Sequence, residues 1–213
     1  MTKFHKETNK RRYFIKLKIK LPDFIFQIGN LWWVFWSNIR WCRATKNFPL
    51  REEDTDKELA TSSVDEFYEK LPNLINNIYK TFTWTEDSPD QLWDSIRPPA
   101  QCYEDAVNGA LNDDCDGYHS AIYWLLKNNG IESYLISVAN RNGKGAHCVY
   151  LGKDTDGHFF VVNYQAIDKL NATTLKETKA EIKKLFENSY GTDPSVSYFD
   201  YNNKFNLSSQ EIR

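Results

Sequence analysis

Asn112-Asp113-Asp114-Cys115-Asp116-Gly117-Tyr118-His119 places a single cysteine where a polar loop gives way to a helix. Apolar residues then recur at intervals of three and four up to a stop signal at Asn129-Gly130, which predicts a helix. Asp113 or Asp114 is a suitable N-cap, so Cys115 falls in the first helical turn. The helix dipole favours a thiolate there, although the neighbouring carboxylates oppose it. Cys115 is therefore a candidate nucleophile, and the alternative is a small buried apolar residue.

The 213-residue chain is rich in aromatic side chains, with seven Trp, twelve Tyr and thirteen Phe. It is long enough to form one or two domains with a sizeable core. Residues 1–50 hold seven Lys and four Arg against Glu7 and Asp23, a net charge of +9, so residues 51–213 carry −11 of the total of −2. This division predicts a basic N-terminal segment, residues 1–50, attached to an acidic folded domain, residues 51–213.

The four cysteines, at positions 42, 102, 115 and 148, lack the close spacing of a disulfide framework or a zinc ribbon. Reduced thiols in a cytoplasmic protein are the simplest interpretation. No recognised nucleic-acid-binding module accompanies the basic residues, so we expect no nucleic-acid partner. The sequence predicts no particular oligomeric state.

Within the basic segment, residues 22–41 are predicted to form one amphipathic helix. Pro22 opens it, and apolar residues follow at spacings of three and four. The uninterrupted apolar run is shorter than the about 20 residues of a membrane span, and no cleavage site of a signal peptide follows it. Two interpretations stay open. The helix packs on the body or a partner, or it lies on an anionic membrane surface with Trp at the interface and Lys and Arg nearby.

The acidic domain begins after a polar stretch, residues 46–62, which we predict to be a linker. Ser63 and Glu66 form a capping-box pattern ahead of a helix that ends near residue 82. Residues 83–112 are predicted to hold loops or short helices. After the cysteine helix we expect strands over residues 131–139, 146–152, 158–164 and 195–201. One further helix is expected over residues 174–188, between the last two of these strands. This order predicts an α+β fold.

His147 is the candidate base for Cys115, because it follows a glycine turn at the start of a predicted strand. The turn that follows this strand predicts a hairpin with Gly152 opposite His158, and that register places Asn163 directly across from His147. An Asn side-chain oxygen there accepts a proton from one imidazole nitrogen and leaves the other nitrogen facing Cys115. The sequence thus predicts a Cys115–His147–Asn163 triad, which a single bulge would disrupt by moving Asn163 to the other face.

Three segments carry a resemblance to a known family: Trp93…Pro99…Asp114-Cys115-Asp116-Gly117-Tyr118, Ala146-His147-Cys148-Val149 and Gly157…Val161-Val162-Asn163. In this order they resemble the transglutaminase-like superfamily, and within it most of all the bacterial transglutaminase-like cysteine proteinases. The likeness covers roughly residues 63–170. It implies a papain-like or transglutaminase-like fold, with the cysteine helix packed on an antiparallel sheet.

The resemblance also implies roles for the triad. Cys115 attacks an acyl carbon, His147 activates it, and Asn163 orients the histidine. The chain departs from the family pattern at Asn163, where Asp is usual, and at Asp114, where a glycine usually precedes the cysteine. The implied activity is thiol-dependent acyl transfer or amide hydrolysis on a protein or peptide substrate, without cofactor or metal. The alternative is a catalytically inactive binding module that keeps the fold and docks through its N-terminal helix.

Two further groups of residues are weaker candidates. Cys115, His119, His147 and Cys148 are the residue types that bind zinc. Adjacent strand residues point to opposite faces, however, so His147 and Cys148 do not readily share one metal. Gln101 and the backbone amide of Cys115 are candidate donors to an oxyanion, and a structural role is the alternative for Gln101.

Overall fold

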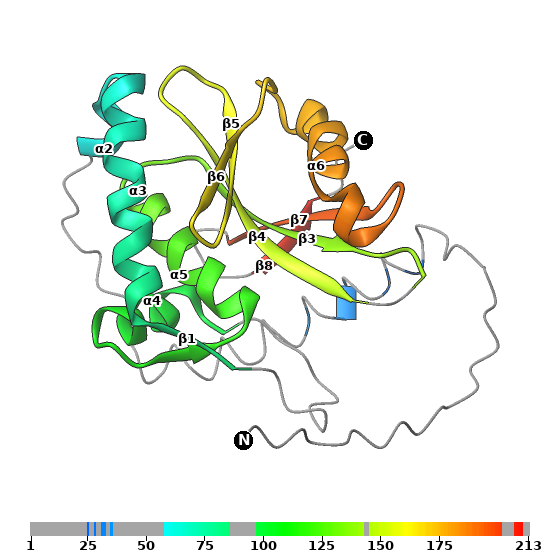
Figure 1. Cartoon of the computed structure of the whole chain (residues 1–213), viewed down its shortest axis with the longest axis horizontal. Helices are drawn as coiled ribbons and strands as arrows, with labels where there is room; N and C mark the ends of the chain where they lie inside the picture. Colours follow the sequence, from blue (N-terminus) through cyan, green and yellow to red (C-terminus); the bar gives the residue numbers. More distant parts are fainter. Residues whose placement is uncertain are drawn as a thin grey trace, which may run out of the picture.

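The structure is a computed structural model of the chain. It describes residues 58–85, 97–142, 145–201 and 207–210, together with five positions of the N-terminal segment, namely Ile25, Ile28, Leu31, Trp32 and Phe35. The fold is mixed α+β, as the order of elements predicts, and helices lie on both sides of one antiparallel sheet (Figure 1).

From residue 58 onward, the described helices are α2 (Glu58–Thr61), α3 (Val64–Thr81), α4 (Pro99–Val107), α5 (Cys115–Asn128) and α6 (Leu175–Tyr190). The side chain of Ser63 caps α3 by accepting a hydrogen bond from the Glu66 amide at 3.3 Å. Thr174 and Glu177 form a complete capping box at the start of α6. Both helix starts therefore agree with the sequence, because capping is a local interaction.

Six strands form the main sheet in the order β6-β5-β4-β3-β7-β8, and every neighbouring pair is antiparallel. They are β3 (Ser133–Ala139), β4 (Ala146–Lys153), β5 (Phe159–Asn163), β6 (Ala166–Lys169), β7 (Ser195–Tyr201) and β8 (Leu207–Gln210). A separate parallel pair joins β1 (Phe82–Trp84) to β2 (Leu111–Asp113). This pair ties the end of α3 to the start of α5, because β2 leads directly into the cysteine helix.

Alternating side chains of the central strands build two cores. On β4, Cys148 and Tyr150 belong to a core shared with α3, α4 and α5, whereas Val149 and Leu151 belong to a core shared with α6. This is the period of two expected for a sheet covered on both faces. Helix α5 lies deepest, with nine of its 14 residues buried, so its N-terminal end is held rigidly against the sheet.

Several predictions for the domain are wrong in detail. The predicted linker includes α2 at its end. Residues 83–112 hold a short helix, α4, which is one of the two predicted alternatives and begins at Pro99 because proline is favoured in the first turn of a helix. They also contribute to strands β1 and β2, which were not predicted. Strands β6 and β8 were not predicted, because each has only 4 residues and such short edge strands lack a clear pattern.

The β4–β5 hairpin has a register different from the predicted one. Gly152 pairs with Phe160 rather than His158. The physical reason is the turn, in which the Asp154 carboxylate accepts a hydrogen bond from the His158 amide at 2.9 Å and so draws His158 into the loop. The shift is two residues, and side chains alternate with a period of two, so each side chain keeps its predicted face.

The helix predicted over residues 22–41 lies mostly outside the described residues. Its five described positions are helical, and their apolar side chains are between 39% exposed at Ile25 and 64% exposed at Leu31. These five side chains therefore do not form part of the core of the domain. Within the part of the chain that is described, no helix combines the length and apolar character needed to cross a membrane.

Candidate active site

Cys115 is the first residue of α5, and Asp114 is the N-cap, as predicted. The Asp114 carboxylate accepts a hydrogen bond from the Asp116 amide at 2.9 Å, and the Asp113 carboxylate accepts one from the Asp114 amide at 3.0 Å. A Cβ atom at Gly117 would lie 2.2 Å from Asp113 Cγ, so only glycine fits there. These caps fix a half-buried cysteine at the positive end of the helix dipole, a position that favours the thiolate.

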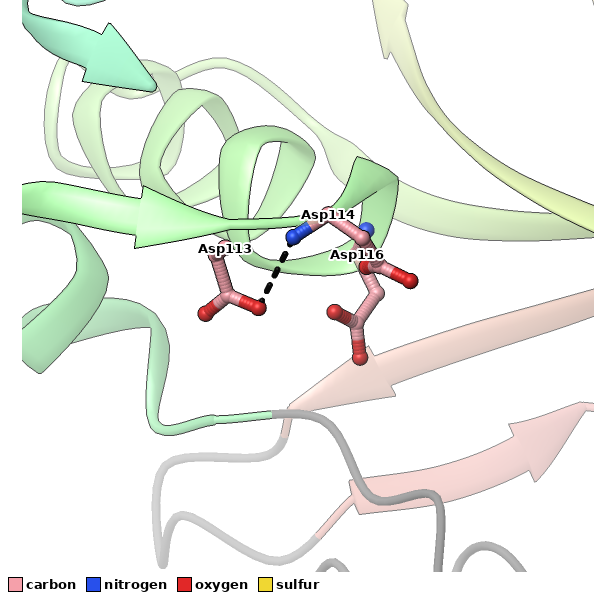
Figure 2. Close-up of side chains that lie close together, drawn as sticks. All are labelled: Asp113, Asp114 and Asp116. Atoms are coloured by element: carbon pink, nitrogen blue, oxygen red, sulfur yellow. Dashed lines mark hydrogen bonds between the residues drawn. The ribbon is translucent and has the colours of Figure 1, made fainter. Parts of the chain in front are cut away.

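Three carboxylates gather at this helix start, from Asp113, Asp114 and Asp116 (Figure 2). Their oxygen atoms lie within 4.8 Å of one another, which is close enough for a shared cation. Arg97, however, donates to Asp113 Oδ2 at 3.0 Å and also binds Asp105. Burial raises the pKa of Asp113, and Arg97 opposes that rise. Arg97 and backbone amides thus bind the carboxylates of Asp113 and Asp114, which serve to hold the start of the helix.

The sulfur atom of Cys115 contacts the first part of β4. The backbone N–H of Cys148 donates a hydrogen bond to Cys115 Sγ at 3.3 Å, and such a donor stabilises a thiolate more than a thiol. The Cys148 side chain itself is buried in the core beneath α5. His147 immediately precedes Cys148, so the candidate nucleophile touches the peptide unit that follows the candidate base.

His147 meets Asn163 as expected, in spite of the different register. His147 Nε2 lies 2.9 Å from Asn163 Oδ1. Asn163 is the last residue of β5, and in the observed register it is a diagonal neighbour of His147, within reach of these side chains. Because the amide oxygen accepts the Nε2 proton, Nδ1 is left as the basic nitrogen of the ring.

Aromatic side chains enclose the His147 ring. Its centroid lies 5.7 Å from that of Tyr164 and 6.2 Å from that of Tyr190, whose plane is within 2° of parallel. The ring of Phe186, from α6, also lies beside it, with 6.2 Å between the two centroids. Burial lowers the pKa of His147, whereas the bond to Asn163 and the Asp114 carboxylate raise it. The Asp114 carboxylate, which opposes a thiolate at Cys115, thus also favours the imidazolium form of His147.

A second histidine, His119, lies one helical turn beyond Cys115 and is fully buried. Its Nδ1 is 2.6 Å from the Cys115 carbonyl oxygen, and its Nε2 accepts a hydrogen bond from the Tyr164 amide at 3.1 Å. Burial lowers the pKa of His119 to about 3. Both ring nitrogens are engaged, so His119 is not placed to ligate zinc, and the zinc interpretation is wrong for this residue.

The sequence did not predict the aromatic residues that surround His147. Tyr190 and Phe186 reach His147 from α6, and no local pattern reveals how that helix packs on the sheet. Tyr164 carries a signal only by directly following Asn163. Gln101 lies in the first turn of α4, and its contribution to an oxyanion site stays a prediction.

Comparison with models of protein families gave no match to this chain, and comparison with curated proteins gave none. The likeness to the transglutaminase-like superfamily therefore depends on the motifs of the sequence. Any assignment of function depends on the arrangement of Cys115, His147 and Asn163.

Proposed function

We propose that this protein is a cysteine enzyme of papain-like or transglutaminase-like fold, which hydrolyses or transfers acyl groups through Cys115, His147 and Asn163. One observation carries the proposal, namely the pair of bonds at the start of β4. His147 Nε2 binds Asn163 Oδ1 at 2.9 Å, and the following residue, Cys148, donates its amide to Cys115 Sγ at 3.3 Å. The first bond supports an oriented imidazole, and the second supports a sulfur atom that lies at a helix N-terminus against the peptide unit following His147.

In the acylation step, the Cys115 thiolate attacks the carbonyl carbon of an amide. An S–C bond forms, and the carbonyl π electrons move onto the oxygen, towards which the Cys115 amide is a candidate donor. As the tetrahedral intermediate collapses, the His147 imidazolium gives its Nδ1 proton to the leaving nitrogen and the C–N bond breaks. The products are a free amine and a thioester on Cys115.

In the second step, water or an amine attacks the thioester carbon while neutral His147 accepts a proton from it. The C–S bond then breaks, which restores the thiolate and the imidazolium. Water yields a carboxylic acid, and an amine yields a new amide. The steps require no cofactor, and the proposed substrate is a protein or peptide.

A cytoplasmic location belongs to the same proposal. In the described part of the chain, Cys102, Cys115 and Cys148 are thiols that are not joined in a disulfide. Thiols persist in the reducing cytoplasm, where a thiolate nucleophile stays available. Contact of residues 22–41 with a membrane surface remains a separate prediction.

Alkylation with iodoacetamide tests the proposal, because the thiolate reacts and the thiol does not. Cys115 should react faster than Cys102, which is fully buried and whose burial raises its pKa, and faster than buried Cys148. His147→Ala should slow the reaction at Cys115. If Cys115 reacts slowly and His147→Ala changes nothing, the chain is instead a non-catalytic binding module that docks through its N-terminal helix.

Turnover assays then separate hydrolysis from transfer. A library of quenched fluorescent peptides reports hydrolysis, and incorporation of a fluorescent primary amine into a protein acceptor reports transfer. Cys115→Ser should abolish either signal while the fold is retained, since the two side chains have nearly the same shape.

A further inference from the structure

Tyr164 directly follows Asn163 and adopts a left-handed backbone conformation, with φ of 53°. That conformation is uncommon for a residue other than glycine. Both backbone polar groups of Tyr164 bind α5, since its N–H donates to His119 Nε2 at 3.1 Å and its C=O accepts from the Tyr118 hydroxyl at 3.1 Å. The end of β5 is thereby held against the first two turns of α5.

His119 extends this connection to the nucleophile. Its Nδ1 donates to the Cys115 carbonyl oxygen at 2.6 Å. One imidazole ring therefore joins the first residue of α5 to the peptide unit that follows Asn163. One nitrogen must donate and the other must accept, so only the neutral tautomer with a proton on Nδ1 makes both bonds.

We propose that His119 is a positioning residue that aligns the Cys115 turn with Asn163 and, through Asn163, with the ring of His147. This inference rests on the proposed function, because it assigns His119 to the same triad. His119 is not an acid or a base in the reaction, since it is fully buried and both of its nitrogens are bonded within the protein.

A packing role alone does not account for this residue. Burial of a polar ring is unfavourable unless its nitrogens are hydrogen-bonded, and a phenylalanine would fill the space without that requirement. Burial, together with the nearby His147, lowers the pKa of His119 to about 3. The ring therefore stays neutral near neutral pH, and both bonds persist while His147 changes its charge.

Three substitutions separate the two bonds. In His119→Asn the amide nitrogen lies near the position of Nδ1 and keeps the bond to Cys115. In His119→Gln the amide oxygen reaches the position of Nε2 and keeps the bond to Tyr164. His119→Phe fills the ring space and makes neither bond. Tyr198→Phe is a matched control, because it removes a buried hydroxyl bond to Thr178 in the other core.

Two measurements report alignment rather than stability. The first is the rate of alkylation at Cys115 as a function of pH. The second is the NMR signal of the His147 Nε2 proton, which the bond to Asn163 protects from exchange. We expect His119→Phe to slow alkylation near pH 7 by about tenfold, the effect of about one pKa unit at the thiol, and to remove the protected signal. The Asn and Gln variants should lie between it and the wild type, and Tyr198→Phe should lose stability alone.

An unchanged alkylation profile and an unchanged His147 signal in all three His119 variants would overturn the inference. The proposed function fails separately, if His147→Ala leaves the alkylation of Cys115 unchanged. In that case the NMR signal of His147 in His119→Phe still decides whether His119 positions the His147 ring. Should the variants not fold, the wild-type protein decides. Its His119 ring must carry its proton on Nδ1 and must not titrate between about pH 5 and pH 8, and a titrating ring overturns the inference.

Discussion

Acid should destabilise this protein through His119, and the effect has a definite sign and size. The pKa of His119 falls from 6.5 to about 3 on folding, because the ring is buried. Below about pH 6.5 the unfolded chain binds a proton that the folded protein does not bind, so the free energy of unfolding decreases until about pH 3. At about 1.4 kcal/mol per pKa unit, the full loss is about 5 kcal/mol.

Comparison with His119→Gln isolates this contribution. Burial also lowers the pKa of His147, which acts in the same direction, and raises the pKa of Asp113, which acts in the opposite direction. The Asp113 contribution cancels in the difference between wild type and variant, and the His147 contribution is reduced there to the effect of the bond to Asn163, which raises the His147 pKa. Near neutral pH the variant should be less stable by about 1–3 kcal/mol, since a buried hydrogen bond is lost. In acid it should become the more stable protein, with the two stability curves crossing near about pH 5.

Urea denaturation at a series of pH values measures both curves, with tryptophan fluorescence and circular dichroism as independent probes. The slope of the free energy of unfolding against urea concentration should be the same in both proteins, so the urea concentrations at their unfolding midpoints can be compared directly. Parallel curves for the two proteins from neutral pH to about pH 3 would refute the reasoning. They would mean that His119 is protonated in the folded state or is not buried.

Three further predictions follow from the site and the N-terminal segment. Asn163→Ala should slow alkylation of Cys115 and lower the free energy of unfolding by about 1 kcal/mol. Asn163→Asp should keep the alkylation rate and shift the histidine limb of its pH profile upward, because a carboxylate raises the histidine pKa. Gly117→Ala should cost about 1–3 kcal/mol and slow the same alkylation, because its Cβ would meet Asp113; an unchanged melting temperature would contradict that close contact. Trp32→Glu combined with Trp36→Glu should abolish salt-sensitive binding to anionic vesicles, and a wild-type protein that does not bind at low salt would exclude the membrane interpretation.

The features predicted correctly from the sequence are those that local interactions determine. An aspartate before Cys115 caps α5 by bonding an amide two residues away, and the Thr174 capping box joins two residues three positions apart. The aromatic walls of the site could not be predicted in this way. Tyr190 reaches His147 only because α6 packs across the sheet, and that placement depends on the whole core beneath the helix.

The predicted register of the β4–β5 hairpin is wrong by two residues, yet His147 and Asn163 still meet. The pleat explains this result, since a shift of two residues preserves the face of every side chain and a shift of one would exchange Asn163 with Val162. Val162 belongs to the core under α5. Alternation is therefore a safer basis than register for predicting which polar residues of a hairpin share a site.

The end of β5 connects the fold to the proposed chemistry. Tyr164 turns into a left-handed conformation, so the extended strand stops at Asn163 and the next peptide unit is presented to α5. His119 binds the N–H of Tyr164 and Tyr118 binds its C=O, and His119 also binds the carbonyl of Cys115. Helix α5 thus carries the candidate nucleophile and also holds the strand that orients the candidate base. A change in its first two turns should therefore act on both partners at once, which is why substitutions at His119 test the geometry of the proposed triad without altering any of its members.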